Sequence, residues 1–123
     1  MIAYIISLVV LIILLGILCY LFPIIETEGR SMLPTYKSGA YLLGMRLFKY
    51  KRLQLGKCYV YTRYDEEGEA HVVIKRLKQY THINNITYCY FEGDNKDESY
   101  DSRHYGYINA ENIIAKVLWQ IKK

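Results

Sequence analysis

The chain begins with MIAYIISLVVLIILLGILCYLFPII, residues 1–25, a stretch that contains no charged side chain. A helix of this length is about 37 Å long, which is enough to cross a hydrocarbon core about 30 Å thick with some tilt. A cleaved secretory signal would have a shorter apolar region that ends in small residues, and a buried helix of a soluble protein is seldom uncharged for so long. We therefore expect a retained single-pass membrane anchor over residues 1–25.

Residues 26–123 hold every charged side chain and are long enough for one small domain. Aromatic and β-branched residues predict strands there, and no stretch shows sustained helical periodicity. The predicted strands are residues 41–45, 57–62, 71–77, 86–91 and 113–119, with an acidic turn at residues 65–69. The predicted fold class is mainly β, a compact β-domain on a single N-terminal transmembrane helix.

Basic residues gather after the anchor. The net charge is +4, and residues 29–64 contain no Asp or Glu. The basic residues of this stretch are Arg30, Lys37, Arg46, Lys49, Lys51, Arg52, Lys57 and Arg63. Anionic lipid headgroups, nucleic acid and ordinary solvation are each consistent with such a stretch. The anchor makes nucleic acid the poorer choice, so we expect a lipid bilayer and no nucleic acid as partner.

The three cysteines, Cys19, Cys58 and Cys89, do not have the spacing of a zinc site. Cys58 and Cys89 fall on predicted strands and would be able to pair in an extracytoplasmic domain. Buried free thiols are the more common outcome for such residues. No metal or other cofactor is expected.

Three stretches hold the side chains best suited to chemistry. Residues 27–35, TEGRSMLPT, place Ser31 just beyond the anchor. Residues 72–77, VVIKRL, place Lys75 on an apolar strand, and residues 93–103, GDNKDESYDSR, form a polar loop. Taken singly, the three stretches are typical of a turn, an edge-strand lysine that faces water, and a second turn.

A serine hydroxyl becomes a nucleophile only with a base within hydrogen-bond reach. None of the histidines, His71, His82 and His104, has a spacing that points to catalysis. Lysine is an alternative partner of serine, but its amine must be neutral, so its pKa must lie well below the usual value of about 10.4. Burial disfavours the ammonium form, and Lys75 follows three apolar strand residues.

An anchor, a serine, a strand lysine and a polar loop, in this order, resemble the type I signal peptidases, including the mitochondrial inner-membrane peptidase-like members. The resemblance covers nearly the whole chain and implies a signal peptidase-like catalytic domain over residues 26–123. It implies a membrane-bound serine endopeptidase that cleaves signal peptides from translocated, membrane-tethered preproteins through an acyl-enzyme. Ser31 would be the nucleophile and Lys75 the general base.

The resemblance also implies roles for residues of the closing loop and its surroundings. Ser99 would hydrogen-bond the Lys75 amine and orient it. Asp101 and Arg103 would brace the loop, together with Arg76. The remaining matched loop residues include Asp94.

Substrate recognition is implied by the same resemblance, which calls for a small, shallow apolar pocket that accepts small side chains such as Ala. The residues expected to line it are Met32, Tyr36, Val73 and Ile74. Gly29 stands where many members have a serine that donates to the oxyanion. The Ser31 amide and a second donor would then have to bind the oxyanion.

The family cuts on the extracytoplasmic face of the cell membrane, or at the mitochondrial inner membrane in a eukaryote, and we expect the domain there. The positive-inside rule would instead favour the cytoplasm, because the basic residues follow the anchor. Ser31 lies at most about 20 Å along an extended chain from Ile25, so bonds just outside the bilayer are within its reach. The alternatives are a catalytically silent homologue that binds apolar peptides or lipid at the membrane surface, a self-cleaving repressor-type protease, and a basic lipid-binding module.

Overall fold

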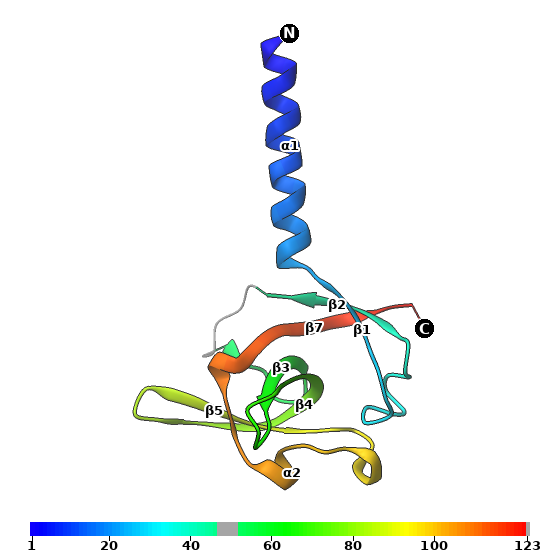
Figure 1. The fold of residues 1–123 in the computed structure, drawn as a ribbon, viewed down its shortest axis with the longest axis vertical. Coiled ribbons are helices and arrows are strands. Elements are labelled where there is room, and N and C mark those ends of the chain that lie inside the picture. Colours follow the sequence, from blue (N-terminus) through cyan, green and yellow to red (C-terminus); the bar gives the residue numbers. More distant parts are fainter. Residues whose placement is uncertain (47–51, 123) are drawn as a thin grey trace.

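A single apolar helix, α1 (Ile2–Leu21), projects away from the rest of the chain (Figure 1). The computed structural model describes residues 1–46 and 52–122, so Lys49 and Lys51 of the basic stretch lie outside the described residues. None of the α1 side chains is buried, and the helix is long and apolar enough to cross a membrane. It is about 30 Å long and ends four residues earlier than predicted. Pro23, which has no N–H to continue a helix, follows it closely.

Within the described residues, seven strands form one antiparallel sheet in the order β1-β2-β7-β3-β4-β5-β6. The strands are β1 (Ile24–Glu26), β2 (Tyr41–Met45), β3 (Cys58–Tyr64), β4 (Ala70–Ile83), β5 (Ile86–Glu92), β6 (Ile108–Asn109) and β7 (Ile113–Lys122). The short helices are the 3₁₀ helices η2 (Lys96–Glu98) and η3 (Ala110–Asn112) and the single-turn α2 (Ser102–Tyr105).

The mainly-β fold predicted from the sequence is confirmed, and each of the five predicted strands corresponds to an observed one. The main difference is β4, which continues six residues beyond the predicted end to Ile83. Asn84 and Asn85, both with positive φ, make the two-residue turn that returns the chain into β5. Such a turn matches the twist of a hairpin and tolerates asparagine. β1 and β6 are too short to leave an alternating pattern.

The core consists of two apolar clusters that share β3. Side chains alternate between the two faces of a strand, and Cys58, Tyr59, Val60 and Tyr61 are all buried, so β3 is covered on both faces. Tyr59 and Tyr61 pack with Leu77, Cys89 and Phe91 in one cluster. The other cluster comprises Met32, Leu42, Cys58, Val60, Ala115 and Val117.

Cys58 and Cys89 are buried free thiols, as expected from the sequence. They belong to different clusters, and burial raises the pKa of Cys58 to about 11 and that of Cys89 to about 12. Both side chains therefore serve as small apolar residues of the core.

Candidate active site

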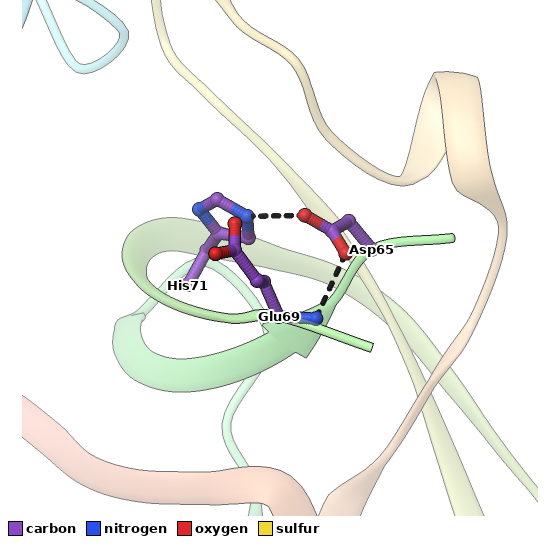
Figure 2. A group of neighbouring side chains, drawn as sticks. All are labelled: Asp65, Glu69 and His71. Carbon is purple, nitrogen blue, oxygen red and sulfur yellow. Dashed lines mark hydrogen bonds and ion pairs between the residues drawn. The ribbon is translucent and has the colours of Figure 1, made fainter. Parts of the chain in front are cut away.

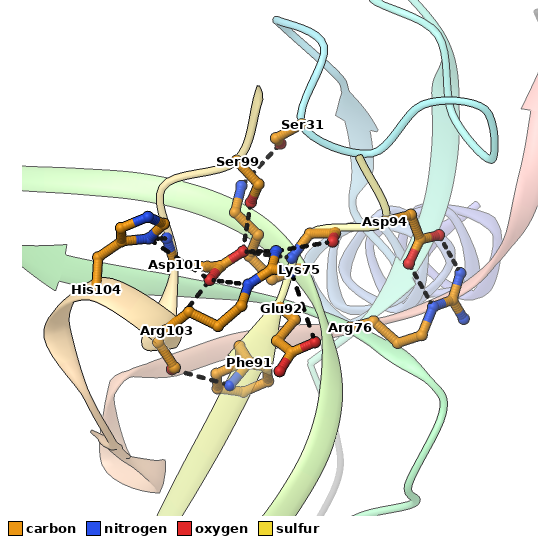
Figure 3. Close-up of polar contacts among 12 residues, drawn as sticks. Ser31, Lys75, Arg76, Phe91, Glu92, Asp94, Ser99, Asp101, Arg103 and His104 are labelled. Carbon is orange, nitrogen blue, oxygen red and sulfur yellow. Dashed lines mark hydrogen bonds and ion pairs between the residues drawn. The ribbon is translucent and has the colours of Figure 1, made fainter. Parts of the chain in front are cut away.

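Ser31 and Lys75 meet at the open edge of the sheet although 44 positions separate them in the chain (Figure 3). Ser31 lies in the loop between β1 and β2, and Lys75 lies on β4, where it pairs with Tyr59 of β3. β5 pairs with β4 only from Arg76 onward, so the other edge of β4 is open at Lys75. The Lys75 Nζ and the Ser31 Oγ are 2.8 Å apart, which is hydrogen-bond distance.

The Lys75 side chain is shielded from solvent, since the residue is only 5% exposed. Burial lowers the pKa of this amine below its ordinary range, because a buried ammonium loses its hydration. The carboxylate of Asp101 acts in the opposite direction, and the guanidinium of Arg63 lowers the pKa further. The net direction favours a neutral amine, the form that accepts a proton.

Asn95 fixes the loop that carries Ser31 through main-chain contacts. Its backbone N–H donates to the Ser31 carbonyl at 2.8 Å, and its side-chain amide donates to the Arg30 carbonyl at 3.0 Å. The same amide donates to Glu98, which also forms an exposed ion pair with Arg30 at 2.9 Å. The nucleophile loop is thus attached directly to the segment that follows β5.

Asp94 connects three segments of the chain. It accepts a hydrogen bond from the Thr35 hydroxyl at 2.5 Å and two from the Arg76 guanidinium at 2.8 and 2.6 Å. Arg76 also donates to the Gly56 carbonyl. The bonds from Arg76 hold the pKa of Asp94 below its usual range, so the carboxylate stays charged. These contacts join the nucleophile loop, β4 and the loop after β5 next to the Ser31–Lys75 pair.

Asp101 is fully buried and accepts hydrogen bonds from three partners. They are the Gly93 backbone N–H at 2.8 Å, the Ser99 hydroxyl at 2.6 Å and the Arg103 guanidinium at 2.9 and 2.6 Å (Figure 3). Burial alone would raise the pKa of Asp101, but these hydrogen bonds, chiefly from Arg103 and Ser99, outweigh it and lower the pKa. Asp101 is therefore a buried carboxylate that ties Gly93, Ser99 and Arg103 of the loop after β5 together.

Gly93 leaves no room for a side chain between the loop that carries Ser31 and the segment that carries Ser99. A Cβ at this position would lie 2.1 Å from the Ser99 Oγ and 2.7 Å from the Ser31 carbonyl oxygen. Only glycine allows these two groups to approach the same point of the backbone.

A cavity of about 170 Å³ opens beside Ser31. It is lined by all four residues that the sequence predicts for a substrate pocket, Met32, Tyr36, Val73 and Ile74, together with apolar neighbours such as Ile25 and Val72. The lining is mixed, because Glu26, Thr27, Glu28, Ser31 and Lys75 add polar groups to the apolar residues.

The family model for signal peptidases, peptidase S26, matches residues 56–121, which is more than half of the chain. This chain belongs to the signal peptidase family, peptidase S26. The match includes Lys75 and the loop with Ser99 and Asp101, and it begins after Ser31. None of the curated proteins compared with the chain matches it.

One contact differs from those that the resemblance implies. Ser99 donates its proton to Asp101, and the described hydrogen bonds include none between Ser99 and Lys75. Arg76 pairs with Asp94 at the start of the loop, and Arg103 pairs with Asp101 near its end. The two arginines thus hold two separate carboxylates of the same loop.

Gly29 has a φ of +81°, a backbone conformation that glycine adopts without strain. It has no side-chain donor, and its N–H donates to the Ser38 hydroxyl at 3.2 Å. For the Ser31 N–H, no hydrogen bond is found among the described residues. The Ser31 backbone N–H is thus one donor of this loop for which the described residues provide no partner.

The sequence alone predicted no contact for four residues that lie in or near the site: Thr35, Asn95, Glu98 and Arg63. Asn95 acts through main-chain carbonyls, and the contacts of Arg63 are with tyrosine rings. No spacing in the chain foretells either kind of contact. Thr35 is the exception, since its place four residues after the serine in the matched motif would have been a usable signal.

A separate polar group lies at the turn between β3 and β4 (Figure 2). The Nε2 atom of His71 is 2.9 Å from the carboxylate of Asp65, which also accepts the backbone N–H groups of Glu67 and Glu69. The ligand atoms of Asp65, Glu69 and His71 lie within 4.8 Å of one another, a donor set of the kind that divalent cations use. The observed hydrogen bonds account for the turn itself, and we assign the group that structural role.

Proposed function

We propose that this protein is a membrane-bound serine endopeptidase in which Ser31 and Lys75 form the catalytic dyad. The observation that carries the proposal is the 2.8 Å contact between the Ser31 Oγ and a Lys75 amine that is only 5% exposed. A nucleophile beside a desolvated base is the arrangement that acyl transfer requires. Membership in the peptidase S26 family supports the same reaction class.

The reaction follows from the properties of the two groups. The neutral Lys75 amine takes the proton of the Ser31 hydroxyl as its oxygen attacks the scissile carbonyl. The resulting ammonium gives that proton to the leaving amine, the peptide bond breaks, and an ester to Ser31 remains. Lys75 then takes a proton from water, which attacks the ester, and the proton returns to Ser31 as the acyl product leaves.

Charge develops on the carbonyl oxygen in both steps. The Ser31 N–H is our candidate for the first oxyanion donor, because Gly29 has no side chain to contribute. Loss of one such donor costs about 10²–10³ in rate in other serine peptidases. The substrate backbone or water would have to supply the second hydrogen bond.

The substrates we propose are preproteins held in the bilayer by their own signal peptides. α1 would anchor residues 1–25 in the membrane, and residues 26–123 would form the catalytic domain on the extracytoplasmic face. Enzyme and substrate that share a membrane meet at a raised effective concentration. The cavity beside Ser31 would take the small residue that precedes the scissile bond.

The proposal is tested with the full chain in lipid vesicles or detergent and a purified preprotein. Ser31→Ala and Lys75→Ala are each expected to lower processing by roughly 10³-fold or more, because each removes half of the dyad. Ser7→Ala in the helix and Lys78→Ala on the exposed face of β4 are the matched controls and should process at the wild-type rate.

Absence of processing by the wild-type protein, with lipid or apolar peptide still bound, would identify a silent homologue. Processing that survives Ser31→Ala would exclude the dyad. Cleavage of the chain itself and of no added substrate would point to a self-cleaving protease.

A further inference from the structure

Arg63 lies on the same face of the sheet as Lys75. Tyr59 of β3 pairs with Lys75 of β4, and Arg63 pairs with His71 in the same register. Opposed residues of an antiparallel pair point to the same face, and alternate residues of a strand do so as well. Tyr59, Tyr61 and Arg63 therefore share the face on which the Lys75 amine lies.

The Arg63 guanidinium is fixed by aromatic rings. Its central carbon lies 5.0 Å from the ring centre of Tyr100 and 5.3 Å from that of Tyr105. The Tyr105 hydroxyl shares a hydrogen bond of 2.6 Å with Tyr61, which stacks on Phe91 in the core. This arrangement holds the cation against the segment that contains Ser99 and Asp101.

The charge of Arg63 has no acidic partner among the described residues. Arg30, Arg76 and Arg103 each form an ion pair with a carboxylate, whereas none of the described ion pairs includes Arg63. Its Nε atom is buried and has no hydrogen-bond partner. The ring faces attract the guanidinium but do not cancel its net charge.

The surroundings of Lys75 and Arg63 contain charges of both signs. Titratable or charged groups face the pair from the nucleophile loop, from β3 and β4, from the β3–β4 turn and from the segment after β5. These groups are Ser31, Tyr59, Tyr61, Tyr64, Asp65, Glu66, Glu67, His71, Ser99, Tyr100, Asp101, Arg103, His104 and Tyr105. Asp101 is the nearest carboxylate to act on the amine, but it is already bonded to Arg103, and His71 is bonded to Asp65.

We propose that Arg63 is a positioning residue for the dyad, whose unpaired guanidinium, fixed against Tyr100 and Tyr105, favours the neutral form of the Lys75 amine. The inference rests on the proposed function and deepens it, since Lys75 must be neutral to accept the Ser31 proton. Burial lowers the pKa of Lys75, and the positive charge of Arg63 acts in the same direction.

The test uses the full chain and the pH dependence of kcat/KM for preprotein processing. Activity rises with pH as Lys75 loses its proton. Arg63→Met removes the charge, so the ammonium becomes less unfavourable and the rising limb should move to higher pH by about half a unit. This is the order of effect expected of one unpaired charge in partly solvated surroundings. At a fixed pH within the rising part of the profile, kcat/KM of Arg63→Met should be about threefold lower than that of the wild type.

Arg63→Lys is the matched variant, since it keeps the positive charge but loses the planar guanidinium that lies over the two tyrosine rings. The rising part of its pH profile should stay close to that of the wild type. Arg46→Met is the control for a tyrosine-stacked arginine elsewhere, at the end of α1 over Tyr20, and its limb should not move. The Lys75 amine is also titrated directly by NMR of protein labelled with ¹³C at lysine Cε. That signal comes from lysine side chains alone, so it reports on Lys75 without a contribution from His71 or His104.

The outcomes are distinct. An upward shift in Arg63→Met and Arg63→Gln, absent in Arg63→Lys, supports the proposal. An unmoved limb and an unmoved Lys75 signal in the neutral variants would overturn it while leaving the dyad intact. If both neutral variants unfold and Arg63→Lys does not, Arg63 is a structural residue and the proposal is rejected. A wild-type protein that is inactive, or active without Lys75, contradicts the proposed function itself.

Discussion

At the residue scale, the site depends on a few side chains whose pKa values differ from those in water. Lys75 is a buried amine to which no carboxylate of the described residues is bonded, and Asp101 is a buried carboxylate with several donors. Burial favours the neutral form of the first, and hydrogen bonds favour the charged form of the second. The two opposite environments lie side by side on the loop after β5 and on β4.

Asp101→Asn should destabilise the protein in a pH-dependent way. The folded-state pKa of Asp101 is lowered, so its contribution is present above the unfolded value of about 3.9 and is lost as pH falls through the folded pKa. We expect the substitution to lower the free energy of unfolding by roughly 2–4 kcal/mol at pH 7, because it removes the buried charge that pairs with Arg103. Denaturant titrations of both proteins at pH 7 and pH 3 measure this difference. An equal difference at both pH values would contradict the assignment.

Gly93→Ala should abolish processing and lower stability. The added methyl would collide with the Ser99 Oγ and the Ser31 carbonyl, and one of these segments would have to move. Preprotein processing and thermal unfolding in the same detergent measure the two effects. Gly16→Ala in α1, where no atom lies within 4 Å of the added methyl, is the control and should leave both unchanged. Wild-type activity in Gly93→Ala would mean that the close approach is unimportant.

At the element scale, loops carry Ser31, the proposed nucleophile, and the residues that hold it, and the sheet carries Lys75, the proposed base. β4 is paired with β3 throughout residues 70–76, which gives Lys75 a fixed backbone. The loop that carries Ser31 lies between β1 and β2 and is not itself a strand of the described sheet. Hydrogen bonds with Asn95 and Asp94 hold it instead. The precision of the Ser31–Lys75 contact therefore depends on bonds between loops.

Asp94→Asn should slow the reaction without moving its pH dependence. The amide has one acceptor oxygen in place of two, so it cannot serve both Arg76 and Thr35 as the carboxylate does, and the attachment of the Ser31 loop weakens. A misplaced nucleophile costs rate steeply, and we expect kcat to fall about 10- to 100-fold. Steady-state kinetics over a range of pH measure this change. Asp97→Asn, an exposed neighbour in η2, is the control and should behave like the wild type.

Apolar patterning predicted the elements that cover the core, and local chemistry explains where it stopped. The predicted strands at residues 57–62 and 113–119 are rich in buried residues, whereas the extension of β4 through Gln79 and Thr81 is exposed and leaves no pattern. The proximity of Ser31 and Lys75 followed only from resemblance to a family, because periodicity says nothing of contacts 44 residues apart. The Asn95 contact to a backbone carbonyl and the Arg63 stack depend on tertiary placement alone.

At the scale of the whole molecule, an apolar helix long enough to cross a membrane and a small β-domain meet at the short strand β1. Ser31 follows β1 closely, so the reacting pair stays near the end of α1 along the chain. Arg46 reinforces this junction, because it donates to the Tyr20 carbonyl and lies over the Tyr20 ring at 4.8 Å. The arrangement suits substrates that are themselves held in the bilayer.

Leu11→Lys in the middle of α1 should weaken membrane insertion. A lysine at the centre of a spanning helix costs about 2.5–3.5 kcal/mol on biological insertion scales. Alkaline carbonate extraction of membranes should therefore release a large fraction of the variant and little of the wild type. Leu11→Ala is the control, and it should remain in the membrane. Equal retention of the lysine variant would indicate that α1 does not span the bilayer.

The most direct test of the account is the pH dependence of kcat/KM for preprotein processing by the full chain, together with that of Lys75→Ala. The account predicts a rising limb well below the ordinary lysine pKa of about 10.4, and no such limb in the residual activity of the variant. A limb at the ordinary lysine value, or an unchanged limb without Lys75, would contradict the claim that a neutral buried lysine activates Ser31.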